Sequence, residues 1–376
     1  MDKKKVILPE DLHFMQLALR LARRGYPAPN PHVGAVVVKS SRIIAQGYHA
    51  YAGGPHAEVA ALRKAGDDAR GATLYVTLEP CCHFGRTPPC TDAIIKHGIK
   101  RVEVSSLDPN PLVSGQGIKC LKSAGIEVEV GIGDEEALKI NEIFYHFHRL
   151  GRPFVTLKAA MTLDGKIASY TGDSQWITSP SARRIGHQLR AEHGAVLIGR
   201  GTALKDDPEL TARVPRVKNQ PIRIVLDEEL DINPDAKLLN TILSPTLIAT
   251  CSNDPERVQK LTAKGAEVIH LPQDAAGQIS LPSLLMVLGK RGITGVLVEG
   301  GGETLGSFVE QKLFDKVAFF YAPKLLGGRN AKTAIEGQGF QSVAEAIELR
   351  EVKIKKIGGD WLVTGYPATD LSNEPD

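Results

Sequence analysis

The chain has 376 residues, of which 42% are hydrophobic and 24% are charged, and its formal net charge is +3. This length suits two domains of ~150–220 residues, and the composition is that of an ordinary globular protein. The small net charge and an aromatic content of 5% argue against a protein built to grip nucleic acid, which concentrates positive charge and stacking residues.

Cysteine usage and hydropathy exclude two further classes. The cysteine count is 5, an odd number in a long chain, which argues against a disulfide framework. No apolar run approaches the ~20 residues of a membrane span, and no apolar signal segment precedes Pro9. We therefore expect a cytoplasmic protein that does not bind membranes.

The first 150 or so residues alternate between helix and strand patterns. Apolar residues at helical spacing predict a first helix from Glu10 that ends on Gly25 as a C-cap. Two short strands joined by a Lys-Ser-Ser turn follow. The predicted strands span 33–38, 42–46, 73–78, 101–105 and 127–130, and the predicted helices that follow the first span 56–64, 90–97 and 117–124. The alternation implies a three-layer α/β domain.

Three metal-ligand residues and a carboxylate fall at the strand-to-helix transitions of this domain. They are His56, Cys81, Cys90 and Glu58. One His and two Cys leave the fourth position of a tetrahedral zinc open for water, whose pKa zinc lowers from ~15.7 to ~7. Glu58 follows His56 by two residues, which is close enough to move that water's proton. The pattern matches the H-x-E…P-C signature of zinc deaminases and predicts hydrolytic removal of an amino group from a base-like ring.

The spacing of the cysteines leaves alternatives open. Eight residues separate Cys81 from Cys90, where the commonest form of the signature has two. Cys82 and His83 are rival ligands on the same loop, and we prefer Cys81 because it directly follows Pro80. A closed structural zinc site with a fourth protein ligand is one alternative, although it has no need of a carboxylate. A metal-free protein with coincidental cysteines is the other.

A Gly- and Pro-containing interruption near 149–153 marks the domain boundary. It gives predicted domains over 1–148 and 152–369, with a frayed polar tail over 370–376. A second alternation then predicts strands over 154–159, 195–198, 222–226, 246–250, 267–270, 295–298 and 316–320, with helices over 180–191, 281–289 and 303–311. The second domain is therefore also α/β, and it has no zinc signature of its own.

A run of glycines, Gly300 to Gly302, follows an apolar strand and opens a helix in the second domain. The free N–H groups of a helix start favour phosphate, which predicts a phosphate- or nucleotide-binding unit. The run is not G-x-G-x-x-G, so it is not the dinucleotide-binding fingerprint, and a tight turn without a ligand fits it equally well. These residues alone do not identify the reaction that this domain catalyses.

Several motifs occur together in one order along the chain. They are NPHVG from Asn30, HAEVAAL from His56, VTLEPCCHFGRTPPC from Val76, KAAMTLDGKIA from Lys158, SQWITSP from Ser174 and APKLLGG from Ala322. Through them nearly the whole chain resembles the bifunctional deaminase–reductases of riboflavin biosynthesis. The resemblance implies a cytidine-deaminase-like three-layer α/β/α domain followed by a dihydrofolate-reductase-like α/β domain.

The resemblance also implies two consecutive reactions on small pyrimidine ribotides. The first removes the 2-amino group of 2,5-diamino-6-ribosylamino-4(3H)-pyrimidinone 5′-phosphate by hydrolysis. The second reduces the ribosyl group to ribityl and gives 5-amino-6-ribitylaminouracil 5′-phosphate. Zn²⁺ and NADPH are the expected cofactors, and the expected assembly is a homo-oligomer formed through the reductase domain.

The family pattern also implies a role for individual residues. In the deaminase domain, His56, Cys81 and Cys90 would bind zinc, Glu58 would transfer the proton and Asn30 would hold the pyrimidine. The expected cofactor-binding residues of the reductase domain are Ala160, Trp176, Thr202, Asp206, Gly301, Gly302, Glu303, Thr304, Leu305, Gly306 and Ser307. The expected substrate-binding residues there are Lys158, Ser174, Arg190, Leu210, Arg213 and Glu299.

Some of these assignments have rivals. Arg190 and Arg213 suit a ribose phosphate through forked, charge-assisted bonds. We place Lys158 near the sugar carbon that receives hydride, and a structural ion pair is the equal alternative. For Trp176 the alternative is plain packing. The glycine loop is one residue longer than the family often has, so the match beyond Gly301 is less direct.

Two other functions compete with this interpretation. A tRNA adenosine deaminase would share the H-A-E and P-C signature, but the modest charge, the low aromatic content and the large second domain argue against it. A non-enzymatic zinc-binding or nucleotide-sensing protein is the other alternative, and it gives Glu58 no role.

Overall fold

A computed structural model describes residues 8–84, 88–111 and 113–368. The chain divides into two compact units. Unit 1 runs up to Gly151 and includes Arg216–Asn219, and unit 2 comprises Arg152–Pro215 and the chain from Gln220 onward. The boundary predicted near 149–153 lies beside this junction. The predicted tail over 370–376, and residue 369, lie outside the described residues.

Unit 1 contains a five-stranded sheet in the order β2-β1-β3-β4-β5. β1 is antiparallel to β2 and to β3, whereas β3, β4 and β5 are parallel. Ser40 and Ser41 have positive φ and form the predicted turn between the first two strands. The strands are β1 (Gly34–Lys39), β2 (Arg42–Tyr48), β3 (Thr73–Leu78), β4 (Arg101–Ser106) and β5 (Glu127–Val130).

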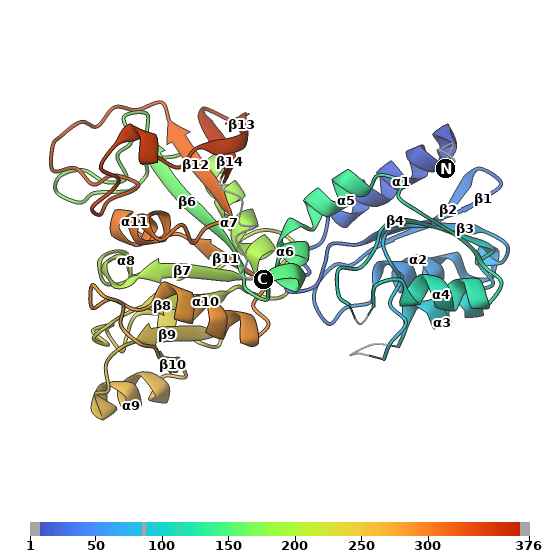
Figure 1. Cartoon of the computed structure of the whole chain (residues 1–376), viewed down its shortest axis with the longest axis horizontal. Coiled ribbons are helices and arrows are strands. Elements are labelled where there is room, and N and C mark those ends of the chain that lie inside the picture. The colour runs from blue at the N-terminus through green and yellow to red at the C-terminus, as the bar shows by residue number, and fades with distance from the viewer. Residues whose placement is uncertain (1–7, 85–87, 112, 369–376) are drawn as a thin grey trace. The chain divides into compact units, whose positions relative to one another are not determined.

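Helices cover both faces of this sheet (Figure 1). One apolar cluster joins the sheet to α1 (Pro9–Ala22) and α5 (Asp134–Ile140). A second cluster, on the other face, joins it to α2 (Ala57–Ala65), α3 (Cys90–Lys96) and α4 (Gln116–Ser123). The 3₁₀ turn Gly66–Ala69 follows α2, and α6 (Glu142–Leu150) follows α5. The predicted three-layer α/β/α architecture is confirmed.

The first helix ends earlier than predicted. Its last residue is Ala22, and Arg23 in right-handed conformation caps it, so Gly25 is not its C-cap. Gly25 instead lies against the backbone of His49, where an added Cβ would clash with the His49 carbonyl oxygen. The glycine therefore permits a close approach of two loops and does not end a helix.

Unit 2 contains a nine-stranded sheet in the order β10-β9-β8-β7-β11-β6-β12-β14-β13. Neighbours from β10 to β12 are parallel, and β14 and β13 add an antiparallel edge. The strands are β6 (Phe154–Thr162), β7 (Ala195–Gly199), β8 (Ile222–Leu226), β9 (Thr246–Thr250), β10 (Glu267–His270), β11 (Gly295–Val298), β12 (Lys316–Ala322), β13 (Leu349–Ile357) and β14 (Asp360–Pro367).

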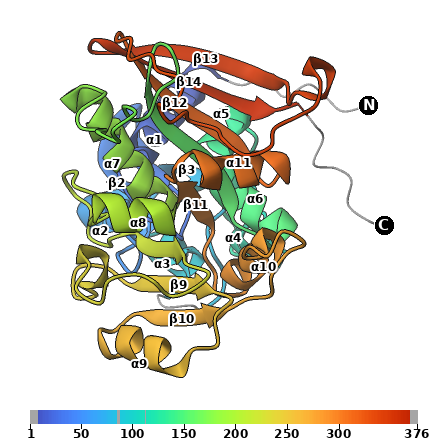
Figure 2. The same cartoon turned by 90° about the vertical axis from the view of Figure 1, so that its left-hand side faces the viewer.

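Helices also cover both faces of the second sheet (Figure 2). On one face lie α10 (Leu281–Lys290) and α11 (Gly302–Glu310), which close the largest apolar cluster. On the other lie α7 (Pro180–His193), α8 (Arg200–Asp206) and α9 (Pro255–Ala263). Short 3₁₀ turns occur at Lys237–Leu239 and Val343–Glu345. Burial of the central strands on both faces explains why they are continuous apolar runs in the sequence.

Candidate active sites

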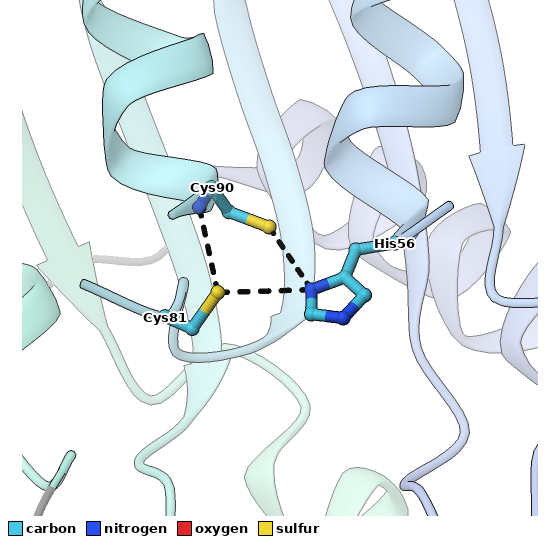
Figure 3. Close-up of side chains that lie close together, drawn as sticks. All are labelled: His56, Cys81 and Cys90. Atoms are coloured by element: carbon cyan, nitrogen blue, oxygen red, sulfur yellow. Dashed lines mark hydrogen bonds between the residues drawn. The ribbon is translucent and has the colours of Figure 1, made fainter. Parts of the chain in front are cut away.

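The predicted zinc ligands meet on the side of unit 1 covered by α2 and α3. His56 is the N-cap of α2, and Cys90 is the first residue of α3. Cys81 lies in the loop that follows β3, because the chain must leave the sheet there to reach the next helix. Figure 3 shows the three side chains turned toward one another.

The geometry of this cluster fits a tetrahedral zinc ion. Zn–S and Zn–N bonds of normal length place neighbouring ligand atoms about 3.4–3.8 Å apart. His56 Nδ1 lies 3.2 Å from Cys90 Sγ and 3.7 Å from Cys81 Sγ. All three ligand atoms lie within 4.8 Å of one another. One imidazole and two thiols are also the donor types that select zinc.

The rival ligands lie apart from the cluster. Among the described residues, the only group of three or more potential ligand side chains within reach of one ion is His56, Cys81 and Cys90. Cys82 is half-buried and His83 is exposed on the loop beyond Cys81. The cluster of three supports an open site, as the sequence pattern predicted, over a closed one.

Glu58 lies in the first turn of α2 and is buried, with 4% of its surface exposed. Burial, together with the negative charge of the neighbouring Cys81 thiolate, raises the pKa of Glu58 to about 7. Hydrogen bonds from Cys90 and from the His56 ring hold the pKa of Cys81 low, at about 4. A carboxyl group that titrates near neutrality both accepts and returns a proton readily.

Asn30 is connected to the cluster through His49, which the sequence analysis did not select. His49 is buried, and its ring lies 5.3 Å from the ring of His56. Its Nδ1 lies 3.1 Å from the Pro55 carbonyl oxygen, and its Nε2 lies 3.1 Å from Asn30 Nδ2. Because a carbonyl oxygen only accepts, Nδ1 carries the proton and Nε2 accepts from the Asn30 amide. The Oδ1 atom of Asn30 is then left to accept from another group.

Unit 2 contains a pocket of about 850 Å³. Nearly all the predicted reductase-site residues line it: Lys158, Ala160, Ser174, Trp176, Arg190, Thr202, Asp206, Leu210, Arg213, Glu299, Gly301, Gly302, Glu303, Thr304, Leu305 and Ser307. Gly306 does not, because it lies against the Glu336 backbone, where a Cβ would clash with the carbonyl oxygen. The pocket volume suits ligands the size of a cofactor and a substrate.

The glycine-rich turn forms one wall of this pocket. It connects β11 to α11, and Gly301 is the helix N-cap. The Gly301 N–H donates to Thr202 Oγ1 at 3.1 Å. Side chains at Gly199 and Gly300 would clash with Thr304, so the glycines let the two strand ends pack around that residue. A helix start that faces a pocket is suited to phosphate groups.

A partly buried ion-pair network lies in the pocket. The Glu299 carboxylate accepts from Lys158 Nζ at 3.1 Å and from Arg190 Nε and Nη2 at 2.6 and 3.0 Å. Arg190 Nη1 donates to the Thr211 carbonyl oxygen at 3.0 Å. Burial alone would raise the pKa of Glu299, but the charges of Arg190 and Lys158 outweigh it and hold that pKa well below its usual range. The guanidinium N–H groups of Arg190 that could bind a phosphate therefore already donate to acceptors within the protein.

Other cationic groups remain more accessible at the pocket. The guanidinium of Arg183 lies over the Trp176 ring, 4.3 Å from its centroid, and donates to the Thr178 carbonyl oxygen at 2.7 Å. Trp176 is 62% exposed, which excludes plain core packing. Arg213 is 59% exposed and pairs with Glu209. Arg183 was not predicted, because it occurs in a helix beside a second arginine and forms no recognisable pattern.

Within the part of the chain that the structure describes, no helix is long and apolar enough to cross a membrane. Two family models match the chain. Residues 8–106 match the cytidine and deoxycytidylate deaminase zinc-binding region, and residues 153–363 match the RibD C-terminal domain.

Relatives match over nearly the whole chain. The riboflavin biosynthesis protein RibD of Aquifex aeolicus is 49% identical over 94% of this chain and 97% of its own. The structure of Acinetobacter baumannii RibD in form 1 covers 96% of this chain and 99% of its own, with 38% identity and a TM-score of 0.85.

A Thermotoga maritima structure carries both activities in its name, diaminohydroxyphosphoribosylaminopyrimidine deaminase/5-amino-6-(5-phosphoribosylamino)uracil reductase. It is 39% identical, covers 95% of this chain and 99% of its own, and has a TM-score of 0.82. With a deaminase zinc-binding region, a reductase domain and full-length relatives of one kind, the chain belongs to the RibD family of bifunctional riboflavin-biosynthesis deaminase–reductases.

Proposed function

We propose that unit 1 removes the 2-amino group of 2,5-diamino-6-ribosylamino-4(3H)-pyrimidinone 5′-phosphate by hydrolysis. The observation that carries this proposal is the meeting of His56, Cys81 and Cys90 beside the buried carboxyl group of Glu58. His56 Nδ1 and the two thiolates would hold Zn²⁺, which when bound lowers the pKa of water enough to supply hydroxide at neutral pH.

Glu58 would carry the protons of this reaction. It takes a proton from the attacking water and passes it to the ring nitrogen beside the carbon under attack. The hydroxyl group added by the attack then gives up its proton, which Glu58 passes to the amino nitrogen; a C=O bond forms as the C–N bond breaks, and ammonia leaves. Burial of Glu58 supports this role, because a pKa near 7 matches both halves of the transfer.

Asn30 would orient the pyrimidine ring. His49 fixes the amide with its NH₂ group toward the imidazole, so Oδ1 is the atom available to the substrate. A carbonyl oxygen at this place selects a ring edge that carries an N–H donor. The His49 ring thereby positions a binding residue, and it is held in turn by the Pro55 backbone.

We propose that unit 2 reduces the ribosyl group of the deaminated product to ribityl with NADPH. The glycine-rich turn, with Gly301 at the start of α11, would contact the cofactor phosphates through backbone N–H groups. Trp176, Thr202 and Asp206 line the same pocket and would contact the rest of the cofactor.

The substrate would lie at the Lys158 side of the pocket. Hydride adds to the sugar carbon bonded to the ring substituent nitrogen, the ribose C–O bond breaks, and the freed oxygen takes a proton. Lys158 would donate to that oxygen, while Glu299 keeps the ammonium group in place. The two interpretations of Lys158 are therefore compatible, since an ion pair orients the side chain and leaves it other N–H donors.

Arg213 and Arg183 would bind the 5′-phosphate, with Ser174 and Leu210 beside it. This differs from the expected pair of Arg190 and Arg213, because Glu299 and the Thr211 carbonyl oxygen already engage Arg190. Arg190 would then shape the site by positioning Glu299 and the Thr211 backbone.

A homo-oligomer formed through unit 2 is part of the proposal. β13 is the edge strand of the nine-stranded sheet, and nearly all of its residues are exposed. Ile354 on this strand is 70% exposed, and Val352 is 49% exposed. Open edge strands with apolar side chains are suited to pairing with a second copy. Light scattering would test it by comparing the oligomeric state of the wild-type protein with that of a Val352→Lys, Ile354→Lys variant. A wild-type protein that is monomeric, like the variant, would contradict the proposal.

The test of the two activities is an assay of the zinc-loaded protein with the diaminopyrimidine ribotide. Ammonia and NADPH are followed together, with a control that lacks NADPH. We expect ammonia without NADPH, and NADPH oxidation only after ammonia has appeared. NADPH oxidation without prior ammonia release would contradict the order, and ammonia release alone would leave the reductase proposal unsupported.

A further inference from the structure

Glu79 is a buried carboxylate that the proposed reactions do not use. It directly follows β3 and precedes Pro80 and the proposed ligand Cys81. It is 3% exposed, and its backbone N–H donates to the Ser106 carbonyl oxygen at 3.0 Å, so the sheet fixes where it lies. A carboxylate this deeply buried requires several donors around it.

All the donors that reach Glu79 in the described structure are backbone N–H groups from one distant segment. Oε1 accepts from Gly117 at 2.9 Å and from Ile118 at 3.3 Å. Oε2 accepts from Gly115 at 2.9 Å and from Asp108 at 3.4 Å. Gly117 and Ile118 belong to the first turn of α4, whose free N–H groups and dipole favour a negative charge. Glu79 therefore fastens the end of β3 to the start of α4.

Close packing of the backbone shows that this junction is specific. A Cβ at Gly117 would clash with the Pro80 carbonyl oxygen and would lie 3.2 Å from Glu79 Cγ. Gly115 has φ +75°, a conformation that favours glycine. The two glycines let the loop before α4 wrap around the carboxylate and touch the residue that precedes Cys81.

Cys81 is also held by hydrogen bonds to a second helix, independently of Glu79. Its carbonyl oxygen accepts from Thr91 N at 3.2 Å, and its Sγ accepts from Cys90 N at 3.4 Å. These contacts join it to the start of α3, whereas Glu79 joins the preceding chain to α4. Beyond Cys81 the loop becomes exposed, with Phe84 at 79%. The direction of the Cys81 side chain thus depends on two anchors.

We infer that Glu79 is a positioning residue of the metal site, which fixes the path of the chain into Cys81 so that its thiolate meets His56 and Cys90. The inference rests on the proposed zinc-binding role of those three residues. Removing the carboxylate releases one anchor and leaves the N–H groups of α4 without their partner. The consequence is a ligand set that holds zinc less firmly, although none of its own members has changed.

The experiment compares Glu79→Ala and Glu79→Gln with Asp11→Asn. Asp11 is the matched control, since it is also a buried carboxylate of unit 1 but pairs with Arg101 and Tyr75 on the α1 face. The rate of zinc transfer to a chromogenic chelator and the visible spectrum of the Co²⁺-loaded protein are measured. We expect release to be roughly 10–100-fold faster in Glu79→Ala. Glu79→Gln, which keeps one acceptor oxygen, should lie between it and the wild type, and Asp11→Asn should match the wild type.

Wild-type zinc release together with a wild-type Co²⁺ spectrum in folded Glu79→Ala would overturn the inference alone. If that variant does not fold, Gly117→Ala replaces it, because it keeps the carboxylate but presses a Cβ against Pro80. Faster zinc release is expected there too, and an unchanged rate would overturn the inference. A wild-type protein that binds no zinc would instead refute the proposed deaminase site, which is a separate result.

Discussion

Glu58 offers the most direct test at the scale of single residues. In Glu58→Gln the side chain keeps its size but cannot transfer a proton. We expect ammonia release to fall about 10²–10⁴-fold, the usual contribution of a general acid–base group. Zinc content, measured by atomic absorption, and the reductase rate serve as controls. A variant that deaminates at the wild-type rate would remove Glu58 from the mechanism.

Asn30 provides a second residue-scale prediction, which concerns polarity. In Asn30→Asp the donor to His49 Nε2 becomes an acceptor, so two lone pairs would face each other. We expect the KM of the deaminase for its substrate to rise by about 10-fold or more, because a buried acceptor left without a donor costs about 1–3 kcal/mol. Zinc content should not change. If KM is unaltered, Asn30 does not contact the substrate.

Sequence reasoning reached some site residues and missed others for physical reasons. His56, Glu58, Cys81 and Cys90 could be predicted because metal chemistry restricts both the residue types and their spacing. His49 and Glu79 could not, since each is a single polar residue after a strand and acts through a partner distant in the sequence. A carboxylate that immediately follows a strand buried over nearly its whole length was nevertheless a usable signal for Glu79.

At the scale of elements, strands buried on both faces were predicted closely, because apolar runs bounded by polar turns are a strong signal. β13 was missed because it is exposed along nearly its whole length and carries lysines on both faces, so it shows no apolar alternation, and its partner β14 was missed with it. α9 had a usable signal that was overlooked. Asp254 precedes Pro255, and its side chain accepts from the next two backbone N–H groups, which is typical of a helix start.

Two glycines, Gly301 at the N-cap of α11 and Gly306 inside that helix, should respond differently to alanine. A Cβ at Gly306 would clash with the Glu336 carbonyl oxygen, whereas at Gly301 the nearest atom would be Thr202 Oγ1 at 3.6 Å. We expect Gly306→Ala to lower the free energy of unfolding of unit 2 by about 1–3 kcal/mol. Gly301→Ala should leave stability unchanged but weaken NADPH binding, measured by fluorescence titration. Equal behaviour of the two variants would contradict this division of roles.

Glu299 joins three elements, since it follows β11, Lys158 lies in β6 and Arg190 lies in α7. Its pKa is lowered in the folded state, so its stabilising contribution is complete above the unfolded value of 4.5 and disappears as the pH falls toward the folded value. We expect the free energy of unfolding of unit 2 to decrease between about pH 5 and pH 3. Glu299→Gln should be about 3–5 kcal/mol less stable at pH 7 and show a flatter pH dependence.

The control for this prediction is Glu267→Gln. Glu267 also pairs with an arginine, Arg291, but it is 54% exposed. Solvent screening makes such a pair weak, so chemical denaturation should give a pH profile close to that of the wild type. A Glu299→Gln variant with an unchanged slope would show that another carboxyl group governs the acid sensitivity.

For the whole molecule, the two units have separate apolar clusters and separate sites. Removal of zinc with a chelator should therefore abolish ammonia release and leave NADPH oxidation intact when the deaminated intermediate is supplied. The two rates are measured on one sample before and after treatment, and readdition of Zn²⁺ is the control. Loss of both activities on chelation would reveal a dependence of unit 2 on the metal site.

The unit 2 pocket contains two partly buried cations, Lys158 and Arg190, against one partly buried carboxylate, Glu299. This centre therefore has an excess of one positive charge, in the same pocket that the proposed phosphate-binding residues Arg183 and Arg213 line, and the excess adds to their attraction for a phosphate-bearing ligand. Affinity for the ribotide should weaken as salt is added, whereas affinity for an uncharged analogue should not. The same excess of positive charge attracts only a compound that carries the phosphate. Once a later reaction has removed the phosphate, the product is no longer attracted back into the pocket.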